Sequence, residues 1–327
     1  MTALDSRSIA GVLGRSPLPG RIGRTPLLPI GGLEGVAPAV RVLGKAEWFN
    51  PGGSVKDRAA WSMVGDGLER SLIGPGSGRR LIDATSGNTG ISFAWLGAVL
   101  GFPVTLAVPA NANLERRRLL ALLGAELVFT DPMSGTDGAI REARRIVAGD
   151  PERWFYPDQY ANPANWRAHY EGTAEEIWAE TGGEVTHFVA GLGTTGTLVG
   201  TARRLRERNP HVHVTAVMPD SPYHALEGLK HLPSAMVPPI YDPAAHDELL
   251  EMDSDAAIDM VRRQGRQGLW LGWSAGAAVA AAERVAQRLE RGVVITVLCD
   301  SAERYLSEPI WDELLGGAER PPREGSA

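Results

Sequence analysis

Short runs of apolar and β-branched residues alternate along the chain with stretches of helical character. We predict strands at residues 40–46, 80–83, 104–108, 126–129, 186–189, 212–217 and 293–298. We predict helices at residues 57–70, 88–100, 114–123, 136–148, 166–180, 198–208, 256–265 and 275–289. Because a helix that connects two neighbouring strands makes them run parallel, this alternation predicts an α/β fold rich in parallel sheet.

The length, charge and cysteine content of the chain narrow its class. Its 327 residues leave room for two lobes around one cleft. With 33 Lys and Arg against 39 Asp and Glu, the net charge of −6 argues against a nucleic-acid partner. The one cysteine, Cys299, excludes a disulfide framework or a thiolate metal cluster, and we interpret it as a small core residue. We expect no metal site and, because the N-terminal region lacks an apolar signal segment, a reducing cytoplasmic location.

One segment has the length of a membrane span. Residues 84–114 carry no charge, and a bilayer needs only about 20 apolar residues. Pro103 and Pro109 interrupt this segment, however, so we interpret residues 88–100 as a buried helix and 104–108 as a buried strand. The sequence therefore predicts an α/β core and no membrane partner.

The first loop whose residues could take part in catalysis has the sequence Asn50-Pro-Gly-Gly-Ser-Val-Lys56 and leads into a predicted helix. A lysine held at a cleft can serve as a Schiff-base amine or as a general base. The alternative is a solvated lysine beside Asp57 in the first turn of the helix.

The second loop reads Thr85-Ser86-Gly87-Asn88-Thr89-Gly90 and opens the predicted helix at 88–100. It places hydroxyl, amide and backbone N–H groups at a helix N-terminus, where an anion such as a carboxylate or phosphate binds favourably. The alternative is a capping turn, but a cap needs only one such residue.

The third loop reads Gly191-Leu-Gly193-Thr194-Thr195-Gly196-Thr197 and follows the predicted strand at 186–189. It matches the pattern G-x-G-x-x-G, and Asp220 lies 24 positions past Gly196, close to the spacing of a dinucleotide-binding fingerprint. By this motif alone the loop predicts an NAD site. Its three threonine hydroxyls suit a lone phosphate monoester equally well, so both ligands remain open here.

Two further segments carry polar residues of interest. In Gly272-Trp-Ser274-Ala-Gly276, Ser274 is either a ligand contact or a plain helix N-cap. The segment 221–231 ends in Lys230 and His231. One hypothesis is that these two side chains sense a leaving group such as phosphate; the alternative is that they are surface charges on a loop.

The three loops and the segment at 272–276, taken in this order, resemble the corresponding motifs of the fold type II pyridoxal-phosphate enzymes. They resemble more closely those of the cysteine synthase and cystathionine β-synthase family. The B-type cysteine synthases are the most similar subgroup, because they share the threonine-rich version of residues 193–197. The similarity extends from Arg24 to Asp300. It implies a two-lobe α/β fold like that of the tryptophan synthase β-subunit, with pyridoxal 5′-phosphate in the cleft between the lobes.

The resemblance implies a role for each loop. Lys56 would hold pyridoxal phosphate as an internal aldimine, Asn88 would contact its ring hydroxyl, and Ser274 would face its pyridine nitrogen. The phosphate would be held by Gly193, Thr194, Thr195, Gly196 and Thr197. The substrate carboxylate would be held by Thr85, Ser86, Thr89 and Gln159.

The implied reaction is a β-replacement that makes L-cysteine from O-acetylserine or O-phosphoserine and a sulfur donor, through α-aminoacrylate. Lys56 would remove the Cα proton and later return it. Alternatives are a cystathionine β-synthase, another replacement or elimination on a serine derivative, and a catalytically silent cofactor-binding protein. An NAD-dependent oxidoreductase is a more distant alternative.

The resemblance also predicts the organisation of the chain. A smaller, mobile lobe would span residues 40–159, and a larger lobe would combine residues 1–39 with 160–315. The polar tail at 316–327 is expected to be disordered. The expected partners are a small amino-acid substrate, a sulfur donor that could be a sulfur-carrier protein, and a second copy of the chain in a homodimer.

Overall fold

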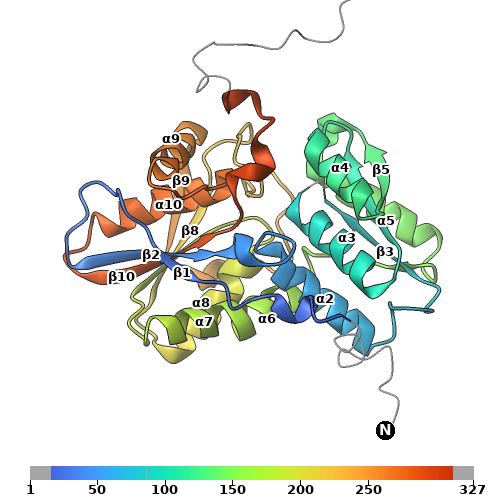
Figure 1. Ribbon diagram of the computed structural model, residues 1–327, viewed down its shortest axis with the longest axis horizontal. Coiled ribbons are helices and arrows are strands. Elements are labelled where there is room, and N and C mark those ends of the chain that lie inside the picture. Colours follow the sequence, from blue (N-terminus) through green and yellow to red (C-terminus); the bar gives the residue numbers. More distant parts are fainter. Residues whose placement is uncertain (1–15, 86, 312–327) are drawn as a thin grey trace, which may run out of the picture.

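Two separate β-sheets organise the chain, one in each half of the molecule (Figure 1). The computed structural model describes residues 16–85 and 87–311. Ser86 and the predicted tail at 316–327 therefore lie outside the described residues. Nine of the ten strands of the two sheets pair in parallel with a neighbour, which confirms the predicted α/β fold rich in parallel sheet.

The larger sheet has six strands in the order β1-β2-β10-β7-β8-β9. Only the β1–β2 pair is antiparallel. Helices α9 and α10 pack on one face of this sheet, and α7 and α8 pack on the other. The bounds are β1 (Leu27–Pro29), β2 (Val40–Ala46), β7 (His187–Gly191), β8 (His213–Pro219), β9 (Glu248–Met252), β10 (Gly292–Leu298), α7 (Ala174–Glu180), α8 (Gly196–Arg208), α9 (Ser254–Gly265) and α10 (Trp273–Ala286).

The smaller sheet has four parallel strands in the order β5-β4-β3-β6. Helices α2, α3 and α4 lie over one face, and α5 covers the other. The bounds are β3 (Arg80–Ala84), β4 (Val104–Pro109), β5 (Glu126–Thr130), β6 (Trp154–Phe155), α2 (Lys56–Glu69), α3 (Asn88–Leu100), α4 (Leu114–Leu122) and α5 (Gly135–Gly149).

The uncharged stretch at 84–114 forms the interior of the smaller half. Helix α3 begins and ends as predicted, and every residue of β4 is buried. Gly101 adopts a left-handed conformation (φ 76°) after α3, which turns the chain back into the sheet. Within residues 16–85 and 87–311, no helix combines the length and hydropathy of a membrane span.

One predicted assignment is wrong at the level of the sheets. We placed the strand at 40–46 in the smaller lobe, but β2 pairs with β10 from Val40 to Ala46 and belongs to the six-stranded sheet. The chain then crosses to the other half through α2, which packs against both α3 and α6 (Pro163–Ala168). Movement of the smaller half remains a proposal.

A second difference concerns the predicted helix at 166–180. The structure divides it into α6, a π-helical turn at His169–Thr173 and α7. A Cβ atom on Gly200 of α8 would overlap the carbonyl oxygen of Trp166 in α6, so α6 and α8 approach each other very closely at this point. Short 3-10 turns lie at Pro19–Arg21, Glu47–Phe49, Pro132–Ser134, Pro243–Ala245 and Ala302–Tyr305.

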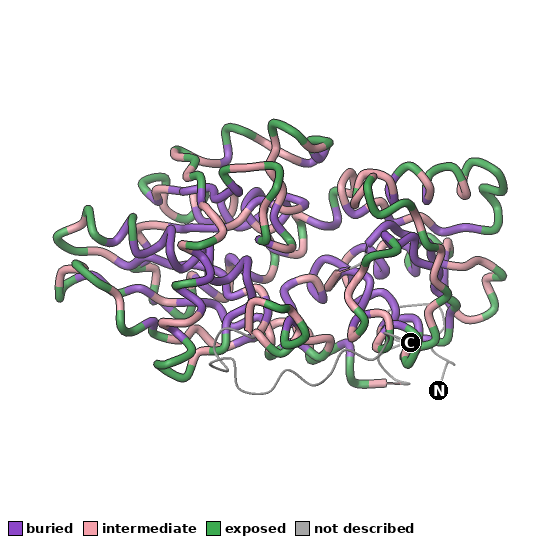
Figure 2. The backbone as a smooth tube through the Cα atoms, turned by 90° about the horizontal axis from the view of Figure 1, so that it is seen from above, coloured by how far each residue is buried: buried purple, intermediate pink, exposed green. Residues whose placement is uncertain are grey.

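Burial follows the two sheets. Figure 2 shows buried backbone concentrated inside each half, with exposed loops around the outside. Since side chains on successive strand residues point to opposite faces, β3 contributes Leu81 to the core beneath α3 and Ile82 to the core beneath α5. The two halves thus have their own cores, and polar loops from both meet between them.

Candidate functional site

A pocket between the two sheets collects the loops singled out in the sequence. In open α/β sheets, ligands bind beyond the carboxyl ends of the strands, and these loops follow such ends. We call this the central pocket. The predicted site residues that line it or its narrow continuation are Lys56, Thr85, Asn88, Thr89, Gln159, Gly193, Thr194, Thr195, Thr197 and Ser274. Gly196 begins α8 between Thr195 and Thr197.

Lys56 begins α2, and its preceding loop is fixed by contacts from three sides. The N–H of Gly52 donates to the carboxylate of Asp57 at 2.5 Å. The N–H of Val55 donates to the carbonyl oxygen of Cys299 at 2.9 Å, which ties the loop to the end of β10. Asp57 is fully buried and accepts a second hydrogen bond from Ser92 of α3 at 2.5 Å. The amine is thus mounted on a rigid loop rather than on a mobile surface.

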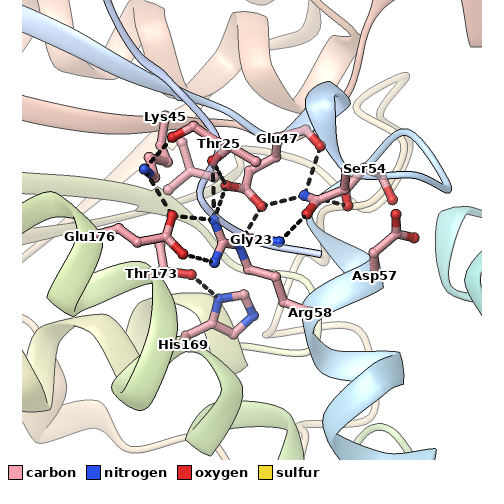
Figure 3. A network of polar contacts seen from close by, with 12 residues as sticks. Gly23, Thr25, Lys45, Glu47, Ser54, Asp57, Arg58, His169, Thr173 and Glu176 are labelled. Atoms are coloured by element: carbon pink, nitrogen blue, oxygen red, sulfur yellow. Dashed lines mark hydrogen bonds and ion pairs between the residues drawn. The ribbon is translucent and has the colours of Figure 1, made fainter. Parts of the chain in front are cut away.

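A buried network of charges anchors α2 at Arg58, two residues after Lys56 (Figure 3). Arg58 donates to Glu47 at 2.7 Å and to Glu176 at 2.7 Å. Lys45 pairs with Glu176 at 2.9 Å, and its side chain is completely buried. Burial alone would raise the pKa of Glu176, but hydrogen bonding and charge from Arg58 outweigh it and lower that pKa to about 2. The network connects β2, α2 and α7 behind Lys56.

The loop between β7 and α8 has the features of an anion cradle. Thr195 adopts a left-handed conformation (φ 73°) immediately before α8, so the loop turns sharply at the helix N-terminus. A Cβ atom on Gly193 would overlap the carbonyl oxygen of Gly228, so this position requires glycine. Asn165 donates to the hydroxyl of Thr194 at 3.1 Å. The loop therefore combines hydroxyls, backbone N–H groups and a helix dipole at one point.

His169 supports this cradle and was not found from the sequence. Its Nε2 atom lies 3.3 Å from the Thr197 hydroxyl, and its Nδ1 atom lies 2.9 Å from the Thr173 hydroxyl. Burial, with the charges of Arg58 and Lys56, lowers the pKa of His169 well below its usual value, so the imidazole is neutral. The sequence signal was faint, because His169 lies in what was predicted to be a regular helix.

Asp300 is a further polar residue that the sequence did not single out. It is fully buried after β10 and accepts hydrogen bonds from Asn88 at 2.7 Å and from the Tyr305 hydroxyl at 2.6 Å. These bonds fix the amide of Asn88 at the edge of the central pocket. The available signal was a carboxylate two positions after the end of a buried strand.

Cys299 lines the central pocket together with Lys56 and Ser274. Burial raises the pKa of its thiol, so it stays protonated near neutral pH. This environment agrees with the interpretation of Cys299 as a small packing residue, although it lies at the site rather than deep within a core.

Two observations test whether these residues fit a phosphorylated aromatic cofactor. The buried side-chain atoms of the described residues that lack a hydrogen-bond partner include Asn88 Oδ1 and Thr195 Oγ1, and both residues line this pocket or its narrow continuation. Buried polar atoms are nearly always hydrogen-bonded, so such atoms point to a missing ligand. The cradle at residues 193–197 suits a phosphate monoester, and Lys56 offers an amine to the same pocket. The site fits pyridoxal phosphate.

Asp83 lies beneath the loop at 85–90 and is completely buried. It accepts a hydrogen bond from the Ala84 N–H at 2.6 Å and a longer one from the Gln159 amide at 3.4 Å. Burial raises the pKa of Asp83 to about 7, and the nearby charge of Asp158 adds to the effect.

This buried carboxyl predicts a pH-dependent stability. An aspartate in the unfolded chain has a pKa of about 4, so the folded protein binds a proton at Asp83 that the unfolded chain has released. The unfolding free energy should therefore fall as pH rises from about 4 to 7. We expect Asp83→Asn to remove part of this dependence and to be more stable than the parent at pH 8 by roughly 2–4 kcal/mol.

Urea unfolding at pH 4.5 and pH 8 measures the effect. The control is Asp150→Asn, which removes an exposed carboxylate at the end of α5. A parent and an Asp83→Asn variant with the same pH dependence would show that Asp83 is ionised in the folded protein.

Comparison with known proteins gives matches over most of the chain. The family described as "Pyridoxal-phosphate dependent enzyme" matches residues 18–300. Cysteine synthase of Aquifex aeolicus is 45% identical over 299 residues, which cover 89% of this chain and 91% of that protein. Cysteine synthase B of Pseudomonas aeruginosa is 40% identical, over 89% of this chain and 96% of that protein. The crystal structure of a cysteine synthase from Entamoeba histolytica superimposes on this structure with a TM-score of 0.84 at 32% identity. The match covers 93% of this chain and 96% of that chain.

Proposed function

Because this chain belongs to the family of pyridoxal-phosphate dependent enzymes, we propose that it makes L-cysteine from an O-activated serine and a sulfur donor. The resemblance to cysteine synthases inferred from the three loops and the segment at 272–276 is confirmed by relatives at 45% and 40% identity. The observation that carries the proposal is the pocket itself, in which the Lys56 amine faces the same space as the cradle at residues 193–197. The dinucleotide alternative loses its support, because the family match over residues 18–300 is to pyridoxal-phosphate dependent enzymes.

The cofactor would be held at three points. Thr194, Thr195 and Thr197 offer hydroxyls to its phosphate at the N-terminus of α8. Asn88 and Ser274 approach from opposite halves of the molecule, and we assign them to the ring oxygen and the pyridine nitrogen. When bound, pyridoxal phosphate supplies a carbonyl carbon that reacts with amines and a conjugated ring that accepts electrons from the substrate Cα.

Lys56 has two roles in this proposal. Its ε-amino group would hold the cofactor, and the same group would remove the Cα proton of the substrate and later return it. The rigid loop from Asn50 to Val55 keeps the amine within reach during both steps.

The substrate carboxylate is assigned to the second loop. Thr85 and Thr89 are buried at the N-terminus of α3, where hydroxyls and the helix dipole favour a negative charge. Gln159 faces the same pocket from the loop after β6, and Asn165 holds its carbonyl oxygen at 2.7 Å. Ser86, which the resemblance also assigned to the carboxylate, lies outside the described residues.

A turnover assay tests the proposal. Purified protein with added pyridoxal phosphate is incubated with O-acetylserine and sulfide, and L-cysteine is quantified by mass spectrometry. We expect cysteine to accumulate only when both substrates are present. Parallel reactions with homocysteine in place of sulfide examine the cystathionine β-synthase alternative. Release of pyruvate without cysteine would instead indicate β-elimination.

Partners and location extend the proposal. We propose a homodimer, which is supported by an apolar groove that Trp270, Leu306 and Trp311 share at the surface. A sulfur-carrier protein remains a proposed alternative to free sulfide. The single thiol of the chain, Cys299, is compatible with a reducing cytoplasmic compartment.

A further inference from the structure

Lys230 and Asp137 form an ion pair at the edge of the central pocket. The Lys230 Nζ atom lies 3.0 Å from an Asp137 carboxylate oxygen, and the side chains are only 11% and 25% exposed. Lys230 belongs to the segment after β8, whereas Asp137 lies in the first turn of α5. The pair therefore joins the two halves of the molecule beside the site. It contradicts the alternative that Lys230 is a plain surface charge.

Other contacts hold the carboxylate in place. The second Asp137 oxygen accepts a hydrogen bond from the Met236 N–H at 3.0 Å. Burial alone would raise the pKa of Asp137, but the bonds from Met236 and Lys230 outweigh it and keep that pKa below its ordinary value. Asp137 is thus a carboxylate at neutral pH. The Lys230 ammonium also lies 5.1 Å from the ring centre of Tyr160, which restricts it further.

A second cation of the central pocket, Arg116, is also paired with a carboxylate. Among the described residues that line the central pocket, the cations are Lys56, Arg116 and Lys230. Arg116 is buried and forms an ion pair with Glu227. Apart from the amine that we assign to the cofactor, each cation therefore has a carboxylate partner. A phosphate group that enters the pocket would have to displace one of these carboxylates or lie beside it.

We propose that Asp137 is a specificity-determining residue that neutralises Lys230, so that the enzyme accepts a serine ester with an uncharged acyl group and discriminates against O-phosphoserine. This inference rests on the proposed function, because it concerns the leaving group of the same reaction. The Cβ–O bond of the ester breaks, and its electron pair leaves on the carboxylate oxygen. Hydrosulfide then forms the Cβ–S bond, so one anion replaces another and no oxidant is needed.

The decisive variant is Asp137→Asn, which removes the charge and keeps the shape of the side chain. We expect kcat/KM for O-phosphoserine to rise at least about tenfold, because the freed Lys230 can pair with the phosphate. The ratio of O-acetylserine to O-phosphoserine kcat/KM should fall by the same factor or more. The double variant Asp137→Asn/Lys230→Met should lose the gain, since the cation that produces it is gone.

Two further measurements complete the experiment. Asp131→Asn removes a carboxylate six positions earlier and controls for the change in net charge; it should leave the donor ratio unchanged. Binding of inorganic phosphate to the cofactor-loaded protein, measured by calorimetry, gives a readout that does not require turnover. We expect Asp137→Asn to bind phosphate at least about tenfold more tightly than the parent.

The outcomes are distinct from those of the proposed function. A parent enzyme that prefers O-phosphoserine, or an Asp137→Asn variant with unchanged donor ratio and phosphate affinity, would overturn the role of Asp137. If the parent turns over no serine ester, the proposed function fails, and phosphate affinity still decides whether Asp137 masks Lys230.

Discussion

Replacing Lys56 with alanine is expected to reduce cysteine formation by at least about a thousandfold, because one amine both holds the cofactor and moves the Cα proton. The same change should abolish the covalent attachment of pyridoxal phosphate. Borohydride, which makes a lysine–cofactor bond permanent, should label the parent at Lys56 and leave Lys56→Ala unlabelled. Peptide mass mapping after reduction identifies the labelled residue.

The control for this variant is Lys230→Met, which removes the other lysine that lines the central pocket. It should retain the borohydride label at Lys56, because Lys230 is engaged by Asp137 rather than by the cofactor. Cysteine formation by Lys56→Ala at a rate near that of the parent would refute the assignment of the amine.

Replacing Arg58 with methionine is expected to lower the unfolding free energy by about 3–5 kcal/mol, the usual cost of leaving a buried charge without its partner. Arg58 is the only described cation that bonds directly to Glu47, and Glu47 is completely buried. Glu176 would keep Lys45 as a partner, whereas Glu47 would retain only the neutral donors Thr25 and Asn50. The effect should appear in urea unfolding of the cofactor-loaded protein.

The matched control is Arg145→Met, on the outer face of α5. Arg145 pairs with Glu142 three residues earlier, but its side chain is 72% exposed, and such pairs contribute little. We expect no measurable change in unfolding for this variant. Arg58→Lys should be intermediate, because lysine keeps the charge but cannot reproduce the two-pronged contact with Glu47. Equal stabilities of Arg58→Met and Arg145→Met would contradict a structural role for the buried network.

Local sequence patterns sufficed to predict much of the fold and of the site. Strand β2 and helix α3 have the predicted limits. Helix α3 is an uncharged, largely apolar run between Gly87 and Gly101, and glycine at both ends marks where it begins and ends. The glycine- and threonine-rich loops could be recognised because their composition exceeds what a simple turn or cap requires. Since the carboxyl ends of parallel strands gather at one edge of a sheet, a loop assigned to such an end is also placed near the others.

Contacts between distant segments could not be predicted in the same way. Arg58 and Glu176 are separated by 118 positions, and neither stands out among the charged residues of its own helix. His169 and Asp300 became apparent only when the chain brought them against Thr197 and Asn88. No local pattern encodes such pairs, because the energy that selects them comes from burial in the folded state.

Short or irregular elements were the weakest part of the prediction. Strands β1 and β6 have three and two residues, too few for an alternating pattern to emerge. The π-helical turn at His169–Thr173 lies directly between α6 and α7, so the pattern along the sequence predicts one continuous helix there. The lobe boundary at residue 40 failed for a related reason, because a buried strand can join either sheet and its own residues do not say which.

The central claim is that Lys56 holds pyridoxal phosphate in a pocket that processes an O-activated serine. The most direct test is a visible absorption scan of the purified protein after incubation with pyridoxal phosphate, followed by titration with O-acetylserine. We predict a yellow protein whose visible band disappears on borohydride reduction and moves to longer wavelength when O-acetylserine is added. A protein that remains colourless after the incubation would contradict the assignment of the pocket, and a yellow protein whose band does not respond to any serine ester would contradict the proposed substrate class.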